Sequence, residues 1–311
     1  ATYEEAEERT LMMRDIYYNF IQDDLAIPLI TGRKTESEKF AGAQDTYTVE
    51  ALMHDGQALQ SGTSHFFGNS FPDAFNIKYA DKNNELHSVY ETSWGLSTRI
   101  IGAIIMVHGD DDGLVLPPRI APIQTRVIPI AQHKEGVLDK AREILAALTA
   151  AGYKAKLDDS DKAPGWKFAE QEILGIPTRI EIGPKDIENG QVVVVRRDTR
   201  EKIVVPIDEI ATRLSEILET MQKEMFERAK AFRDGRISSA TTMEEMGRKF
   251  NEKPGFIKAM WCGGAACEDE VKAQVGGMTS RCIPEEQEHL SDVCVCCGKP
   301  AKHMVYWGRA Y

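Results

Sequence analysis

Residues 92–122 read TSWGLSTRIIGAIIMVHGDDDGLVLPPRIAP. In this stretch the pattern changes from strand to helix and then to a proline-rich linker. Ser97 precedes a run of apolar residues that ends near His108, and Gly109 follows. Serine is a favoured helix N-cap, and glycine commonly ends a helix. We therefore predict a helix from Ser97 to about His108, followed by a linker at the prolines of LPPRIAP.

Arg99 falls in the first turn of this predicted helix, after a predicted strand and a glycine. A helix N-terminus presents free backbone N–H groups and the positive end of the helix dipole, and an arginine there adds a bidentate phosphate donor. The position therefore suits a triphosphate. A buried helix with one salt-bridged arginine explains the pattern equally well, because strand–glycine–helix junctions are common.

The bulk composition is that of an ordinary globular protein, with 311 residues, 42% hydrophobic and 28% charged, which favours two or three domains. The longest apolar run, Ile100–Val107, is too short to cross a bilayer. The acidic start, ATYEEAEERT, has no apolar core typical of a signal peptide and no initiator Met, so we expect an internal start and a cytoplasmic protein. A net charge of −11 argues against nonspecific coating of nucleic acid but permits RNA binding through a local basic face.

Upstream of the quoted stretch, helical spacing of apolar residues predicts a helix from Glu4 to about Asp24. A strand at Ile27–Ile30 and a polar loop follow. Between Tyr47 and Tyr90 the pattern indicates short strands, with a hairpin turn at KNNE, residues 82–85.

Downstream, from about Ile123, strands alternate with helices, which indicates an α/β domain with a mixed sheet. The expected strands are 126–130, 154–158, 178–182, 191–197 and 202–206, and the expected helices are 138–152, 165–175 and 208–232. Beyond Gly235 the periodicity weakens to a short helix near 243–250 and a strand near 304–307.

All six cysteines lie between Cys262 and Cys297. A cluster of this kind without a secretory signal indicates a metal more than a disulfide. The pattern Cys262-x4-Cys267 followed by Cys294-x2-Cys297 supplies four thiolates as two close pairs, the usual donor set of a structural zinc site.

Two cysteines leave alternatives open. Cys296 competes with Cys297, because Cys294-x-Cys296 would also form a pair, although the Gly298-Lys299 step resembles a zinc knuckle and favours Cys297. Cys282 is expected to be a buried bystander. Free thiols or redox cysteines are the competing interpretation of the whole cluster.

The segment GLSTRIIGAIIMVHGDDDGLVLPPRIAP closely resembles the third signature motif of class II aminoacyl-tRNA synthetases in its prolyl form. GRKTESEKFAGA and ALQSGTSHFFG also resemble prolyl-tRNA synthetases, and the resemblance covers nearly the whole chain. It implies that Gln60, Thr63 and Arg99 bind ATP, with the catalytic Arg99 on the γ-phosphate. It also implies that His65 lines the proline pocket.

The resemblance implies an α/β and α+β multidomain fold. Residues 1–121 would be the C-terminal half of a class II catalytic domain built on an antiparallel sheet. Residues 122–234 would form an α/β anticodon-binding domain with a mixed sheet, and residues 235–311 a small α+β zinc-binding domain.

The implied reaction activates L-proline with ATP and then esterifies tRNA(Pro). Such phosphate chemistry depends on positioning and cationic clamps more than on a protein nucleophile. Mg²⁺ bridging the phosphates is expected from the family. We expect Asp110, Asp111 and Asp112 to form a solvated acidic loop, not the ligands of that ion.

The chain departs from the family by lacking the first two class II motifs, which carry the dimer interface and the α-phosphate arginine. It has no room for the editing insertion of bacterial-type enzymes before Trp94, and its C-terminal extension resembles the archaeal/eukaryotic type. We therefore expect a partial chain that cannot make prolyl-adenylate alone, and a homodimer in the full-length enzyme.

The segment from Pro164 to Lys202 interleaves basic residues with strands and resembles the anticodon-binding domain of prolyl-, threonyl-, histidyl- and glycyl-tRNA synthetases. Bases of a single-stranded loop can be read by side chains, with basic groups on the phosphates. The resemblance places Lys167, Glu172, Arg179 and Arg197 near the anticodon. Trp166 either stacks on a base or packs in the core. Solvated strand edges are the alternative interpretation of the charges.

The chain ends in GRAY, and prolyl enzymes with a cysteine-rich tail end in tyrosine, so the resemblance implies an active-site contact for Tyr311. Two other functions compete: a non-catalytic tRNA-binding or sensor protein, and a sibling synthetase for threonine, histidine or glycine. Intact Gln60, Thr63, His65 and Arg99 disfavour the first, and the GTSH segment with the tyrosine-ended tail disfavours the second.

Overall fold

The computed structural model describes residues 2–311, which form two compact units. The first unit comprises the chain up to Asp23 with residues 27–103 and 230–311, and the second comprises residues 24–26 and 104–229. The division falls inside the helices α3 (Arg99–His108) and α7 (Ile210–Asp234). Among residues 2–311, no helix combines the length and apolar character needed to span a bilayer.

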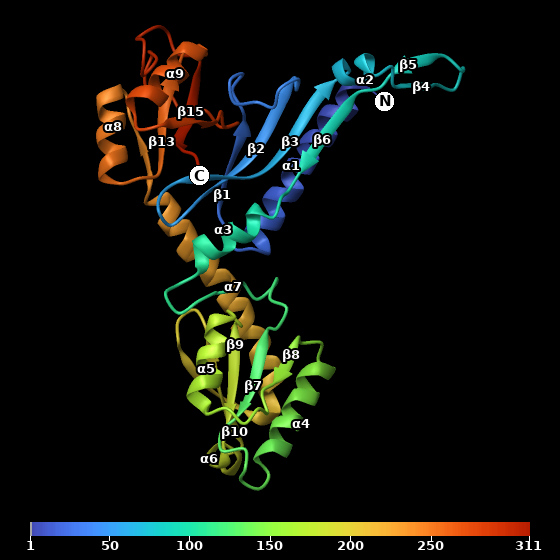
Figure 1. Ribbon diagram of the computed structural model, residues 1–311, viewed down its shortest axis with the longest axis vertical. Coiled ribbons are helices and arrows are strands. Elements are labelled where there is room, and N and C mark those ends of the chain that lie inside the picture. The colour runs from blue at the N-terminus through green and yellow to red at the C-terminus, as the bar shows by residue number, and fades with distance from the viewer. Residues whose placement is uncertain (1) are drawn as a thin grey trace. The chain divides into compact units, whose positions relative to one another are not determined.

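The first unit is built on an antiparallel sheet in the order β1-β2-β3-β6. Its strands are β1 (Leu29–Arg33), β2 (Asp45–Leu52), β3 (Ala58–Gly68) and β6 (Glu91–Gly95). Helix α1 (Tyr3–Asp23) runs along this sheet (Figure 1), and the Ser64 hydroxyl donates to the Thr10 carbonyl at 2.7 Å. One face of the sheet is therefore covered by α1. The short helix α2 (Ser70–Ala74) and the hairpin β4 (Lys78–Ala80) and β5 (Leu86–Ser88) lie between β3 and β6 in the chain.

A second sheet in the same unit has the order β12-β13-β15-β14. Its strands are β12 (Ile237–Ser239), β13 (Phe256–Trp261), β14 (Met278–Cys282) and β15 (His303–Arg309), and its helices are α8 (Met243–Glu252) and α9 (Ala265–Gln274). The two sheets share a buried apolar cluster of Ile30, Leu52, Ala58, Phe256 and Cys282. The edge of β1 also exchanges backbone hydrogen bonds with Ile283, at 2.9 Å and 2.8 Å. The C-terminal residues are thus part of the same packed body as the first sheet.

The second unit is an α/β structure around a mixed sheet in the order β11-β10-β9-β7-β8. Strand β7 runs parallel to β8 and β9, while β9, β10 and β11 are antiparallel. The strands are β7 (Thr125–Pro129), β8 (Ala155–Leu157), β9 (Thr178–Ile182), β10 (Gln191–Arg196) and β11 (Lys202–Pro206). The helices are α4 (Val137–Ala150), α5 (Pro164–Ile173), α6 (Pro184–Glu188), a 3₁₀ turn at Ile207–Glu209, and most of α7. Valines and isoleucines of the sheet pack on α4 and α7 in one core.

The predicted multidomain fold with a mixed and an antiparallel sheet is confirmed. The helices expected at 4–24 and 208–232 and the turn at 82–85 are also found where the periodicity placed them. The first strand was placed wrongly at Ile27–Ile30. It begins at Leu29 and extends to Arg33, because Pro28 has no N–H for the ladder and Arg33 pairs with Ile283.

His108, the last residue of α3, lies in the second unit with its Nε2 2.8 Å from the Leu25 carbonyl. Burial lowers the pKa of His108 from 6.5 to about 4. A histidine whose pKa falls on folding binds more protons in the unfolded chain, so acid destabilises the fold between these two values.

We predict that lowering the pH from about 7 to about 5 costs the second unit about 2 kcal/mol through this group. His108→Gln keeps an N–H donor but cannot be protonated, so it should remove this loss of stability at low pH. Urea unfolding of the second unit at both pH values measures it, with the exposed His133→Gln as the matched control. Equal pH sensitivity in both variants would contradict the assignment.

Candidate functional site

A bulge in β3 aligns the side chains of the predicted ATP and proline site. Along an undistorted strand Gln60 and Thr63 would point to opposite faces, since side chains alternate. The pairing of β2 with β3 runs from Glu50 opposite Gln60 to Val49 opposite Gly62, so Ser61 is an extra residue. The extra residue brings Gln60, Thr63 and His65 onto one face, where all three are half-buried, whereas Ser61, Gly62 and Ser64 are buried.

Arg99 reaches this face from the first turn of α3. Its guanidinium donates to the Gln60 carbonyl at 3.3 Å, and its side chain is otherwise exposed. The helix begins at Arg99, two residues after Ser97, and the Ser97 hydroxyl accepts the Arg99 backbone N–H at 3.3 Å. Opposite Thr63, on β6, Gly95 has no atom within 4 Å of where a side chain would begin. The space beside Thr63 is therefore open on the β6 side.

His65 is held by a hydroxyl and by aromatic rings. Its Nδ1 lies 2.9 Å from Thr46 Oγ1, and its ring centroid lies 5.1 Å from Phe40 and 6.0 Å from Phe67. Burial lowers the pKa of His65 below its ordinary value. The imidazole is therefore neutral at pH 7, a form that can accept or donate one hydrogen bond to a ligand.

A buried ion triad lies on the same face, beside Gln60. Glu50 is fully buried, and its carboxylate accepts from Lys34 Nζ at 2.8 Å and from Arg281 Nη2 at 2.8 Å. Burial raises the pKa of Glu50, but Lys34 and Arg281 outweigh that effect, so the pKa stays below its usual value. Arg281 comes from β14, so the triad joins the two sheets of the first unit.

Tyr311 reaches the start of β3. Its backbone N–H donates to the Ala58 carbonyl at 2.9 Å, and Ala310 forms an isolated bridge with Ala58. Ala58 precedes Gln60 by two residues on the same strand, and the Tyr311 side chain is exposed. The structure therefore brings the chain end beside the strand that carries the predicted ligands.

The second predicted site brings four sulfur atoms together. Those of Cys262, Cys267, Cys294 and Cys297 all lie within 4.8 Å of one another, with Cys262 3.7 Å from both Cys267 and Cys297. Four sulfurs at about 2.3 Å from a tetrahedral zinc ion are about 3.8 Å apart, so the donor set fits that metal. Cys296 is not a member of this group, and Cys282 is buried in the core at 0% exposure.

Local turns create this arrangement. Cys262 follows β13, and Gly263 has a φ of +90°, which turns the chain so that Cys267 falls in the first turn of α9. The second pair lies on a tight turn in which the Cys294 backbone carbonyl accepts the Gly298 N–H at 3.1 Å. Gly298 has a φ of +67°, as such a turn requires. A backbone hydrogen bond from Lys299 lowers the pKa of Cys297 to about 7.

We predict about one tightly bound zinc per chain on these four thiolates. Elemental analysis of protein prepared in metal-free buffer measures it, and Cys282→Ser should leave the content unchanged, whereas Cys262→Ser should lower it. A disulfide between any two of the four cysteines would contradict the prediction.

The second unit contains the four residues predicted to lie near an anticodon, and three of their side chains are buried. Lys167 is 2% exposed and donates to the Asp158 carbonyl at 2.8 Å. Arg197 is 1% exposed and makes a bidentate pair with Asp110, at 2.7 Å and 2.5 Å. A direct contact of either cation with RNA would require these pairs to open.

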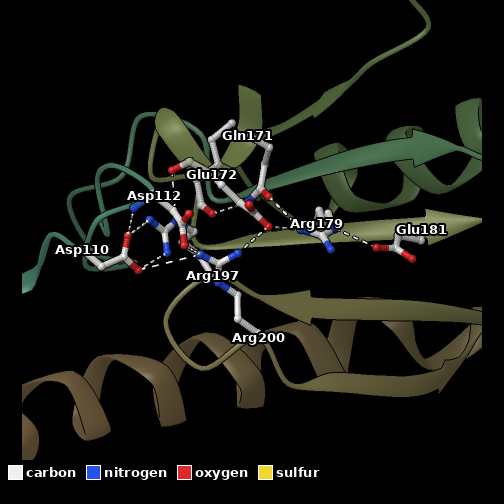
Figure 2. A network of polar contacts seen from close by, with 9 residues as sticks. Asp110, Asp112, Gln171, Glu172, Arg179, Glu181, Arg197 and Arg200 are labelled. Atoms are coloured by element: carbon white, nitrogen blue, oxygen red, sulfur yellow. Dashed lines mark hydrogen bonds and ion pairs between the residues drawn. The ribbon is translucent and has the colours of Figure 1, made fainter. Parts of the chain in front are cut away.

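These pairs belong to a larger network (Figure 2). Glu172 accepts from Arg179 at 2.9 Å and from Arg200 at 2.8 Å, and Arg200 also pairs with Asp112 at 2.6 Å. Asp110, Asp111 and Asp112 are all exposed, in agreement with the expected solvated loop, although Asp110 and Asp112 also pair with Arg197 and Arg200. The network ties the segment after α3 to α5 and to the β10–β11 turn.

Unlike the three buried cations, Trp166 lies at the surface. Its indole is 65% exposed on α5, so the core-packing alternative is wrong. Ile173 and Leu174, at the end of the same helix, are also exposed. The buried charges therefore stabilise this unit, while the tryptophan is open to an aromatic partner.

The sequence matches three family models in succession. Residues 1–108 match the tRNA synthetase class II core domain (G, H, P, S and T), residues 124–217 the anticodon binding domain, and residues 243–311 the prolyl-tRNA synthetase C-terminal domain. The chain is 62% identical over 311 residues to the proline--tRNA ligase of Lachnoclostridium phytofermentans, which covers 100% of this chain and 65% of that protein. The chain belongs to the prolyl-tRNA synthetase family.

Other prolyl-tRNA synthetases match the chain over nearly the same length. The proline--tRNA ligase of Lachnospira eligens is 63% identical over the whole chain, and proline--tRNA ligase 2 of Bacillus cereus is 56% identical over 310 residues. The chain spans 65% of the length of each of these relatives. The family models thus cover both the β3 site and the cysteine cluster of this prolyl-tRNA synthetase relative.

Sequence reasoning missed Glu50, Arg281 and Glu268, which join the two parts of the first unit. Glu50 and Arg281 are 231 residues apart. A local signal existed only for Glu50, an acidic residue in an otherwise apolar strand end.

Proposed function

We propose that this chain is the larger part of a prolyl-tRNA synthetase. Such an enzyme joins L-proline to the α-phosphate of ATP, where the proline carboxylate oxygen attacks phosphorus and pyrophosphate leaves. The 3′-terminal hydroxyl of tRNA(Pro) then attacks the prolyl carbonyl, and AMP leaves. In our proposal Arg99 holds the γ-phosphate, Gln60 and Thr63 contact ATP, and His65 contacts proline.

The observation that carries this proposal is the bulge in β3, which turns Gln60, Thr63 and His65 to one face beside Arg99. Positioned donors of this kind stabilise developing phosphate charge because they need no reorganisation during reaction. The exposed Arg99 has a guanidinium available for a phosphate, and His65 is neutral and flanked by aromatic rings, as suits a small apolar amino acid.

Two metals are part of the proposal. Mg²⁺ would enter with the triphosphate and neutralise its charge. Zn²⁺ would be held by Cys262, Cys267, Cys294 and Cys297, whose spacing fits it, and would cross-link the C-terminal domain. Because Asp110 and Asp112 are paired with arginines, we do not assign them to a metal.

The remaining partners follow from the same proposal. We place tRNA on the second unit, with Trp166 as a stacking contact and with Lys167, Glu172, Arg179 and Arg197 shaping the surface beneath it. A homodimeric, cytoplasmic enzyme, an active-site contact for Tyr311 and the boundaries 1–121, 122–234 and 235–311 also remain proposals.

ATP–pyrophosphate exchange by the full-length enzyme tests the proposal, with proline, threonine, histidine and glycine supplied in turn. We expect exchange with proline alone. Exchange with another of these amino acids would indicate a sibling synthetase, and no exchange with any would indicate a non-catalytic tRNA-binding protein.

A further inference from the structure

The segment between β1 and β2, residues 34–44, connects the candidate site to the C-terminal domain; we call it the β1–β2 loop. At its far end Phe40 packs 5.1 Å from the His65 ring and 5.7 Å from Phe67. The Phe40 backbone N–H donates to Thr46 Oγ1 at 3.1 Å, and the same hydroxyl lies 2.9 Å from His65 Nδ1. The loop therefore supplies one neighbour of the imidazole, Phe40, and hydrogen-bonds to another, Thr46 of β2.

At its near end the loop is held by Glu268 of α9. The Thr35 hydroxyl donates to Glu268 Oε1 at 2.7 Å, and the Ser37 hydroxyl donates to Oε2 at 2.8 Å. Ser280 of β14 donates to the same carboxylate at 2.5 Å. Glu268 is 7% exposed and Thr35 is 2% exposed, so water does not replace these bonds readily.

The turn that leads to Phe40 begins at Thr35. Its carbonyl accepts the backbone N–H groups of Glu38 at 3.2 Å and Lys39 at 2.9 Å. A displaced Thr35 would therefore displace the whole turn. Lys34, the preceding residue, is fixed by the triad with Glu50 and Arg281, which is a second link to β14.

Glu268 directly follows Cys267 in the first turn of α9. Zinc bound to the cysteine cluster would therefore fix the end of the helix from which Glu268 extends. A buried carboxylate that accepts hydrogen bonds from two hydroxyls of one loop restricts that loop to one arrangement.

We propose that Glu268 is a positioning residue for the amino-acid pocket: it holds the β1–β2 loop so that Phe40 and Thr46 orient His65. The C-terminal domain then influences the candidate site by holding this loop in place. The role in proline binding rests on the proposed function, whereas the control of the loop does not.

The test compares Glu268→Gln and Glu268→Ala in the full-length enzyme with Asp269→Asn, an exposed neighbour on the same helix. Hydrogen exchange of residues 34–44, KM for proline, KM for ATP and zinc content are measured for each. Loss of the anchor should speed exchange of the loop and raise the proline KM by about tenfold, with the ATP KM within about twofold, because misplaced binding groups mainly affect the ligand they contact.

Glu268→Gln keeps one acceptor oxygen and the side-chain volume. Its loop exchange rate and its KM for proline should therefore lie between those of wild type and Glu268→Ala. Asp269→Asn should match wild type in both measurements. Unchanged loop exchange in both Glu268 variants would overturn the proposal, as would an equal rise of both KM values with zinc retained. If Glu268→Ala fails to fold, Glu268→Gln decides. Absence of proline-dependent exchange in the wild-type enzyme would refute the proposed function, while the hydrogen-exchange comparison would still decide the role of Glu268.

Discussion

Arg99→Ala in the full-length enzyme should slow proline-dependent ATP–pyrophosphate exchange by about 10²–10³-fold, equivalent to about 3–4 kcal/mol of transition-state stabilisation. The guanidinium is exposed at the start of α3 and makes a long, 3.3 Å hydrogen bond to the Gln60 carbonyl, so it is available for a phosphate. The affinity for tRNA(Pro) should change by less than about twofold.

Arg248→Ala is the matched control, because Arg248 is an exposed helical arginine that pairs with Glu252 on its own helix. It should leave both activities near wild type. Equal losses of exchange and of tRNA binding in Arg99→Ala would mean that Arg99 supports the fold and not the reaction.

Glu50→Ala should lower the free energy of unfolding of the first unit by about 3–5 kcal/mol, because it leaves two buried cations without their shared anion. The side chains of Lys34 and Arg281 are 1% and 5% exposed, so neither can turn to water without moving a strand. Urea unfolding monitored on the first unit measures the change.

Glu36→Ala provides the comparison, since its carboxylate is 79% exposed and pairs with Lys39 on the surface. It should cost less than about 1 kcal/mol. Equal effects of the two substitutions would show that the Glu50 triad does not stabilise the joint between the sheets. Because folding lowers the pKa of Glu50, its contribution should be present above pH 4.5 and be lost as the pH falls below the folded pKa.

Periodic elements could be predicted from the sequence because their signals are local. Helix α1, the hairpin turn at 82–85 and the strands of the second unit follow from the spacing of apolar residues. Strands β12, β13 and β14 and helix α9 were missed, because the cysteine-rich segment is ordered by packing and knuckle turns more than by amphipathic repeats.

The candidate site was predictable only in part. The identities of Gln60, Thr63 and His65 follow from the resemblance, but an alternating strand would have separated Gln60 from Thr63, and only the pairing with β2 reveals the bulge. Glu268 lies 233 residues from Thr35 and has no local signal. The basic residues of the second unit suggested an RNA surface, yet burial of Arg197 depends on Asp110, which lies 87 residues away.

The kinetic constants of His65→Ala and Gln60→Ala test the central claim, that one face of β3 binds proline and ATP at neighbouring positions. In the full-length enzyme, His65→Ala should raise KM for proline by about tenfold or more and leave KM for ATP within about twofold, and Gln60→Ala should do the reverse. If both substitutions raised both constants equally, or neither changed them, the assignment of this face as the substrate site would be contradicted.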